Sequence, residues 1–213
     1  MGRKIEQRSR KREIQNKLKS VILFGFEGKN KTETIYFSKF QSGNNPFNIR
    51  YADGNNTDPV GMIKDVINTM KREDISIEKG DKIYCLIDAD VNKNNQTKID
   101  EAIRLASSEG IEIIMSVPSF EIWYRLHYDY TTGQYSSSEA VSKDLKKYIS
   151  NYDKNSDVFD LLKDRTSVAI EQIKKLEKHH KELGQDVTKE DCNPYTAVYK
   201  PVEYILKPRV LKT

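Results

Sequence analysis

At 213 residues the chain is long enough to form one sizeable hydrophobic core without disulfide bridges or structural metal sites. Cys85 and Cys192 lie far apart and form no CxxC pair, which argues against a zinc site or a disulfide framework. No apolar run approaches the roughly 20 residues that cross a bilayer, and the basic N-terminus lacks the apolar stretch of a secretory signal, so we expect a cytoplasmic protein with no membrane partner.

The net charge of +4 is unevenly distributed along the chain. Residues 1–20 carry eight basic and two acidic side chains, a net charge of +6, which leaves −2 for the rest of the sequence. Such a basic N-terminal arm can neutralise the phosphates of a nucleic acid and release their counterions. It can equally be a solvated tail, and charge alone leaves both interpretations open.

After residue 20 the sequence alternates between strand and helix patterns. Apolar runs predict strands over residues 21–26, 49–52, 81–90 and 111–117. Helical spacing predicts helices over residues 32–40, 58–73, 98–110 and 118–130. Asp58 followed by Pro59 is typical of a helix start, and Gly110 of a helix end. Strands alternating with helices predict an α/β fold, a parallel sheet flanked by helices, up to about residue 130.

The C-terminal part has a different pattern, mostly helical and polar. Helices are predicted over residues 137–149, 160–183 and 193–205. Asn193 and Pro194 are typical of the start of the last one, which Pro201 is expected to kink or break. We therefore predict three segments. They are a basic arm (1–20), an α/β core (21–130) and a helical C-terminal elaboration packed on the core (131–213).

Two familiar phosphate and metal motifs fail on spacing. A P-loop needs glycine, lysine and a hydroxyl residue in succession, whereas Gly28 and Lys29 are followed by Asn30. The stretch that begins at Asp88 starts like an EF-hand loop. Its sixth position is Lys93 instead of glycine, and its twelfth is Ile99 instead of glutamate.

A pattern of carboxylates remains after these exclusions. Asp88 and Asp90 are two residues apart at the end of one predicted strand, so their side chains point to the same side if the chain is extended there. Glu27 follows another strand, and in a parallel sheet these strand ends share one edge, where ligands normally bind. Carboxylates meeting there would repel by roughly 4 kcal/mol per close pair. Mg²⁺ would relieve that repulsion, although aspartates also simply cap turns after strands.

The motifs "EGKNKTETIYF", "IDAD", "SVPSFEIWYRLHY" and "NPYTAV", in this order, resemble the RloB family of bacterial defence proteins. The acidic residues after two of the strands also resemble the Toprim catalytic domain of topoisomerases, primases and OLD-type nucleases. The resemblance spans Val21 to Ile205. The loop between "EG" and "TE" is one residue longer than the family pattern, and Val117 stands where asparagine is usual.

This resemblance implies a Toprim-like (Rossmann-like) fold and Mg²⁺- or Mn²⁺-dependent nuclease chemistry. It implies that Glu27 is a general acid/base or metal ligand and that Asp88 and Asp90 are metal ligands. It further implies a role in phage defence or abortive infection, and an ATPase partner protein.

Four further residues have two interpretations each. Glu121 is either a further metal ligand or base, or a helix N-terminal charge paired with Arg125. Lys154, which matches a family position, either stabilises charge on a phosphate or is a surface lysine. Glu33 is a carboxylate near the site or an ordinary first-turn residue, and His127 is functional or a hydrogen-bonded core histidine.

The expected function is that of a metal-dependent endonuclease acting on RNA, with tRNA as one candidate, or on DNA, as the effector of an anti-phage system. Two alternatives stay open: a non-catalytic subunit that binds nucleic acid or a partner, and a primase-like nucleotidyl transferase. The sequence gives neither the oligomeric state nor the number of metal ions.

Overall fold

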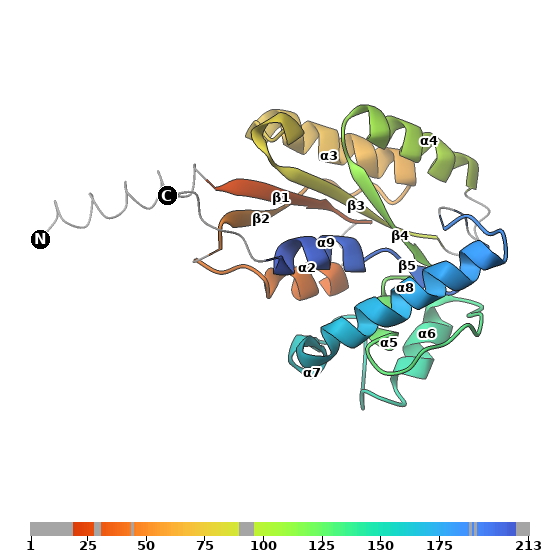
Figure 1. Cartoon of the computed structure of the whole chain (residues 1–213). Coiled ribbons are helices and arrows are strands. Elements are labelled where there is room, and N and C mark those ends of the chain that lie inside the picture. The colour runs from red at the N-terminus through yellow and green to blue at the C-terminus, as the bar shows by residue number, and fades with distance from the viewer. Residues whose placement is uncertain are drawn as a thin grey trace, which may run out of the picture.

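The computed structural model describes residues 19–27, 31–43, 45–89, 96–187, 189 and 191–207. The predicted basic arm lies outside these residues except for its last two. The fold is α/β, with a five-stranded sheet between two layers of helices (Figure 1). The strands are β1 (Ser20–Gly25), β2 (Phe47–Tyr51), β3 (Lys82–Asp88), β4 (Glu112–Val117) and β5 (Tyr195–Thr196). The expected Toprim-like, Rossmann-like fold class is confirmed.

The sheet has the order β2-β1-β3-β4-β5, in which the first four strands are parallel and β5 runs antiparallel to β4. The helices are α2 (Lys31–Ser38), α3 (Pro59–Glu73), α4 (Gln96–Ser108), α5 (Glu121–Arg125), α6 (Ser138–Leu145), α7 (Phe159–Leu162), α8 (Thr166–Glu182) and α9 (Tyr199–Leu206), with 3-10 turns at Ile77–Lys79 and Lys163–Arg165. No helix in the described residues is long and apolar enough to span a membrane.

Both faces of the sheet are covered, which explains the nearly continuous apolar runs of its strands. In β3, Tyr84 and Leu86 join the core under α2, α5, α8 and α9. Ile83 and Cys85 point the other way, into the core under α3 and α4. The alternation is the period of two expected of a strand, and it puts Asp88 on the same face as Leu86. Figure 1 shows α3 and α4 on one side of the sheet and α2, α5, α8 and α9 on the other.

The chain changes direction across the sheet between β1 and β3. From β1 the chain moves outward through α2 to β2, and it then crosses back over α3 to β3, on the other side of β1. From β3 it continues outward through α4 to β4. In open α/β sheets such a reversal leaves a crevice at the carboxyl ends of the two central strands. The acidic residues at these strand ends therefore lie where this fold class binds ligands.

The predicted start of α3 is confirmed in detail. The side chain of Asp58 accepts a hydrogen bond of 3.0 Å from the backbone N–H of Gly61, and Pro59 is the first helical residue. The cap satisfies one of the backbone N–H groups that a helix start leaves without an intrahelical partner.

Replacing Asp58 with Ala is expected to lower the free energy of unfolding by about 1 kcal/mol, because this N–H loses its acceptor. Asp58→Asn keeps a side-chain oxygen and is the control, expected to unfold within a few tenths of a kcal/mol of the native chain. Urea unfolding followed by circular dichroism measures both. Equal losses in the two variants would contradict a capping role.

The helix predicted over residues 118–130 is shorter than expected. α5 is α-helical only over Glu121–Arg125, and turns with i→i−3 hydrogen bonds flank it. They include the bonds from the N–H of Ile122 to the carbonyl of Ser119 and from the N–H of Tyr128 to the carbonyl of Arg125. Tight turns of this kind often begin and end helices, and apolar spacing does not distinguish them from α-helix.

The helix predicted over residues 193–205 divides into β5 and α9. Asn193 does not cap a helix; its side chain accepts from the N–H of Tyr135 and donates to the carbonyl of Tyr135, at 3.1 and 2.7 Å. Pro201 neither kinks nor breaks α9, because it is the third helical residue, where an N–H has no intrahelical partner. β5 joins the sheet, and α9 packs into the core on one face of it. The predicted boundary at residue 130 between the core and a helical elaboration stays a prediction.

Candidate functional site

Acidic side chains follow the carboxyl ends of adjacent strands. Glu27 lies two residues beyond β1, and Asp88 is the last residue of β3, the neighbouring parallel strand. Glu121 is the first residue of α5, four residues after the end of β4. Parallel strands end at the same edge of a sheet, so all three residues lie at the edge of the crevice between β1 and β3.

A fourth carboxylate reaches this edge from α2. Glu33 precedes Tyr36 and Phe37 by three and four residues, so it shares their core-facing side of the helix. Glu33 and Glu121 are both 3% exposed. Helical spacing to two aromatic residues was the sequence signal for the burial of Glu33. We refer to Glu27, Glu33, Asp88 and Glu121 as the carboxylate cluster.

The carboxylate cluster is electrostatically coupled. Burial raises the pKa of Asp88 well above its ordinary value, and the charges of Glu33, Glu121 and Glu27 raise it further. The backbone N–H of Phe120 hydrogen-bonds Asp88 and opposes the rise. Negative charges are therefore gathered in a poorly solvated place, which favours bound protons or a cation.

The proton affinity of Glu33 is shifted into the neutral range. Burial raises its pKa from 4.5 to about 7, and the charges of Glu121 and Glu27 add to this. The N–H of Glu33 and the charge of Lys154 act in the opposite direction. A carboxyl group with such a pKa can exchange protons near neutral pH, as groups at functional sites often do.

Glu121 is bonded on both carboxylate oxygens. The hydroxyl of Ser119 donates to Oε2 at 2.6 Å, and the hydroxyl of Tyr152 lies 3.4 Å from Oε1. The pairing of Glu121 with Arg125, one of the two interpretations of the sequence, is not what the structure has. Arg125 instead donates to Asp144 at 2.6 Å. Helical spacing alone could not show this, because the partner comes from α6.

Lys154 lies near the start of α2. Its charge lowers the pKa of Glu33, and its backbone carbonyl accepts a hydrogen bond from the hydroxyl of Thr32. Its Nζ is 3.4 Å from the hydroxyl of Ser138. The side chain is exposed, so Lys154 could meet an anionic substrate beside the carboxylate cluster, and its role stays a prediction.

His127 belongs to the core. It is fully buried, its Nδ1 is 2.8 Å from the carbonyl of Trp123, and burial lowers its pKa to about 4. A neutral, hydrogen-bonded core histidine is the interpretation that these contacts support. Asp90, the predicted partner of Asp88 in metal binding, lies outside the described residues.

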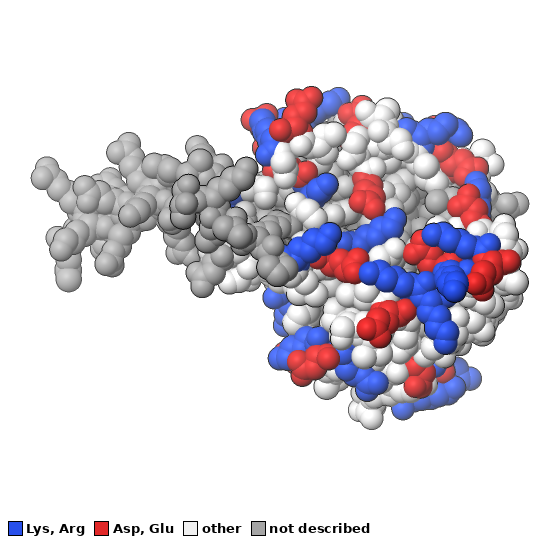
Figure 2. All heavy atoms as spheres, in the orientation of Figure 1, with Lys and Arg blue, Asp and Glu red and all other residues white. Residues whose placement is uncertain are grey.

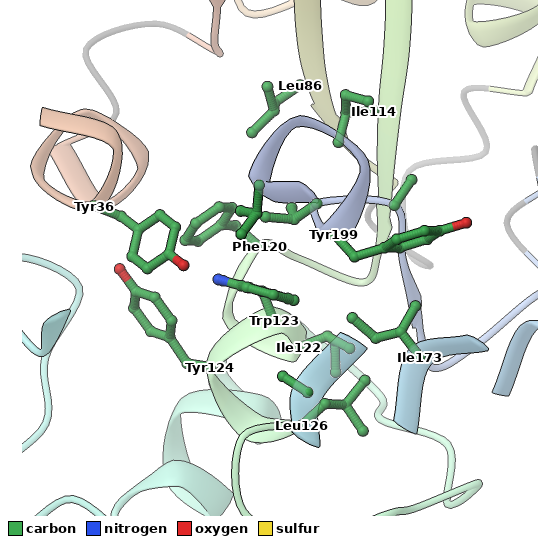
Figure 3. Close-up of a cluster of buried hydrophobic side chains, with 14 of the residues drawn as sticks. Tyr36, Leu86, Ile114, Phe120, Ile122, Trp123, Tyr124, Leu126, Ile173 and Tyr199 are labelled. Carbon is green, nitrogen blue, oxygen red and sulfur yellow. The ribbon is translucent and has the colours of Figure 1, made fainter. Parts of the chain in front are cut away.

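Aromatic side chains of α2 and α5 pack beside the carboxylate cluster. All five residues of α5 are buried, and the ring of Trp123 is 6.1 Å from that of Tyr36 on α2. Phe120 packs edge-on against Tyr124 at 5.2 Å. Figure 3 shows the Trp123 indole nitrogen turned toward the Tyr36 hydroxyl. This packing joins the helices that carry Glu33 and Glu121 and keeps solvent away from both carboxylates.

The donor set fits a hard divalent cation. It consists of carboxylate oxygens, which Mg²⁺ prefers, and their mutual repulsion raises the pKa of Asp88. No group of three or more His, Cys, Asp or Glu side chains within the described ranges is placed to hold a metal ion. Mg²⁺ commonly keeps several waters and binds through one or two carboxylates, so a closed cage is not required.

Comparison with known proteins agrees with this arrangement of motifs. The family model described as "RloB-like protein" matches residues 22–205, which include every member of the carboxylate cluster. No curated protein and no solved structure matches the chain. The match covers the whole sheet except the first two residues of β1 and all helices up to most of α9. The chain belongs to the RloB-like protein family.

Proposed function

We propose that the protein is a metal-dependent nuclease that hydrolyses phosphodiester bonds at the carboxylate cluster. The observation that carries this proposal is the gathering of Asp88, Glu33 and Glu121 beside the carboxyl ends of adjacent strands, where burial and the charges of the two glutamates raise the pKa of Asp88. A folded chain retains such an unfavourable grouping of acids when a cation or a proton is part of its function. The location in the switch-point crevice supports the same conclusion.

Each residue has a distinct part in this proposal. Asp88, with Glu27 and Asp90, holds Mg²⁺ or Mn²⁺. When bound there, such an ion would supply Lewis-acid chemistry, polarising the phosphoryl group and lowering the pKa of an attacking water. Glu121 accepts a proton from that water, as a general base whose oxygens are oriented by hydrogen bonds. Lys154 meets the phosphate and stabilises its developing negative charge.

Nucleic acid is the proposed substrate, RNA or DNA, with the basic arm as a second contact to phosphates. Over α8 and α9 the basic and acidic side chains are intermixed, as in the pairs Lys174–Glu203 and Lys181–Glu177 (Figure 2). Among the described residues, that surface therefore has no separate basic patch that would favour a polyanion such as a nucleic acid. The proposed contacts to nucleic acid are therefore the arm and the carboxylate cluster, and not the face formed by α8 and α9.

Membership of the RloB-like family leads us to extend the proposal to biology. The protein would act in the cytoplasm as the effector of an anti-phage system, together with an ATPase partner. Co-purification of an ATPase, and loss of phage resistance in cells that carry Glu27→Gln, are the expected results.

A cleavage panel tests the proposed activity. Labelled tRNA, single-stranded DNA and duplex DNA are incubated with Mg²⁺ or Mn²⁺, with and without the partner ATPase, using the native chain, Glu27→Gln and Asp90→Asn. We expect shortened products with the native chain and none with either variant. Identical behaviour of all three proteins would contradict the assignment and favour a non-catalytic binding subunit. Extension of a labelled strand when NTPs and template are added would indicate a nucleotidyl transferase.

A further inference from the structure

The carboxylate of Glu121 is fixed by two buried hydroxyl groups from different parts of the chain. Ser119 donates to Oε2 at 2.6 Å from the turn before α5, and Tyr152, 31 residues farther along the chain, lies 3.4 Å from Oε1. Ser119 and Tyr152 are each 1% exposed. Both hydroxyl groups are therefore enclosed with the carboxylate, and their contacts with it are little exposed to bulk solvent.

Two donors on two oxygens determine the plane of a carboxylate. Rotation about the bond to the carboxyl carbon would break both contacts at once, so the group has one favoured orientation. Each carboxylate oxygen has two acceptor sites, and one hydroxyl donor uses only one of them. Both oxygens of Glu121 therefore keep the capacity to accept a proton or a hydrogen bond from a ligand.

Tyr152 is itself held in place by the segment around it. Asn151 has a left-handed backbone conformation, with φ of 59°, and this turns the chain so that Tyr152 enters the core. The Tyr152 ring packs edge-on against Tyr124 at 6.2 Å. Two residues further, the carbonyl of Lys154 accepts from the hydroxyl of Thr32 on α2. The segment thus contacts both helices that contribute Glu33 and Glu121.

We propose that Tyr152 and Ser119 are positioning residues that orient the Glu121 carboxylate toward the reacting water. This inference rests on the proposed nuclease function and adds the residues that prepare its base. The Tyr152 contact is longer than a usual hydroxyl–carboxylate hydrogen bond, and catalytic hydrogen bonds commonly tighten when the substrate binds. A supporting contact of this kind is typically worth about 10- to 100-fold in activity.

The test compares Tyr152→Phe, Ser119→Ala and Tyr195→Phe with the native chain. Tyr152→Phe removes one oxygen atom and keeps the ring that packs on Tyr124. Tyr195→Phe is the matched control, because Tyr195 is equally buried but lies in β5 at the sheet edge. The first readout is the ¹³C signal of the Glu121 carboxyl group in metal-free, Glu-labelled protein. The second is kcat and KM for cleavage with Mn²⁺.

We expect Tyr152→Phe and Ser119→Ala to move the Glu121 signal and to lower kcat by about 10- to 100-fold with little change in KM. Tyr195→Phe should leave both readouts unchanged. An unmoved Glu121 signal in Tyr152→Phe would overturn the inference, whatever the protein cleaves. A moved signal with native kcat would also overturn it. If the signal moves in the two variants but the native chain cleaves no substrate, the contact with Glu121 stands and the nuclease function is rejected.

Discussion

Replacement of Asp88 by Asn is expected to reduce metal-dependent cleavage by about a thousandfold, which corresponds to about 4 kcal/mol of transition-state stabilisation. The substitution keeps the size of the side chain and an oxygen that can accept from the N–H of Phe120. It removes the negative charge that binds the cation. The change should therefore appear in kcat/KM measured with Mg²⁺, on whichever substrate the native chain cleaves.

Asp88→Asn is expected to lower activity but to raise the stability of the metal-free protein. In metal-free buffer Asp88→Asn should unfold at a higher temperature than the native chain, because a partly buried charge next to Glu33 and Glu121 is gone. Asp160→Asn is the control, since Asp160 lies in α7, is exposed and forms an ion pair with Lys163. Native-like cleavage by Asp88→Asn, or a lower unfolding temperature in EDTA, would contradict this account of the site.

In the metal-free protein, protonation of Glu33 is expected to contribute about 3 kcal/mol of stability that is lost as the pH rises from about 4.5 to 7. The pKa of Glu33 is about 7 in the folded chain, against 4.5 as its ordinary value. Between these values the folded state binds the proton of Glu33 and the unfolded state has released it. Stability falls with rising pH wherever the folded state binds more protons. The burial of Asp88 acts in the same direction, and the burial of His127, which lowers its pKa to about 4, acts in the opposite direction.

Urea unfolding in EDTA, repeated at several pH values, measures this loss. Across pH 4.5 to 7 the stability of Glu33→Gln should rise by about 3 kcal/mol relative to that of the native chain, because glutamine has no proton to exchange. Glu109→Gln, at an exposed position just after α4, should retain the native slope. An unchanged difference in stability between Glu33→Gln and the native chain across this interval would show that Glu33 is not desolvated.

The sheet and the meeting of two acids were accessible from the sequence for a physical reason. Parallel strands are buried on both faces, so they appear as continuous apolar runs, and their carboxyl ends share an edge. This placed Glu27 and Asp88 together without any knowledge of side-chain contacts. β5 was not predicted because it has only two residues, and such a short edge strand has no measurable hydrophobic period.

The surroundings of Glu121 could not be derived in the same way. Its contact with Tyr152 depends on a turn at Asn151 and on tertiary packing, neither of which leaves a local pattern. The partner of Arg125 was likewise on another helix, at Asp144. By contrast, the burial of Glu33 could have been predicted, because its spacing to Tyr36 and Phe37 is helical.

Binding of Mn²⁺ to the native chain and to Asp88→Asn, followed by calorimetry at about pH 6 in buffers with different ionisation enthalpies, tests the central claim most directly. The carboxylate cluster predicts that the native chain binds the ion and releases protons, because Asp88 and Glu33 have raised pKa values. Asp88→Asn should bind much more weakly and release fewer protons. Equal affinity in the two proteins, or no binding to the native chain, would contradict a metal site at the carboxyl ends of β1 and β3.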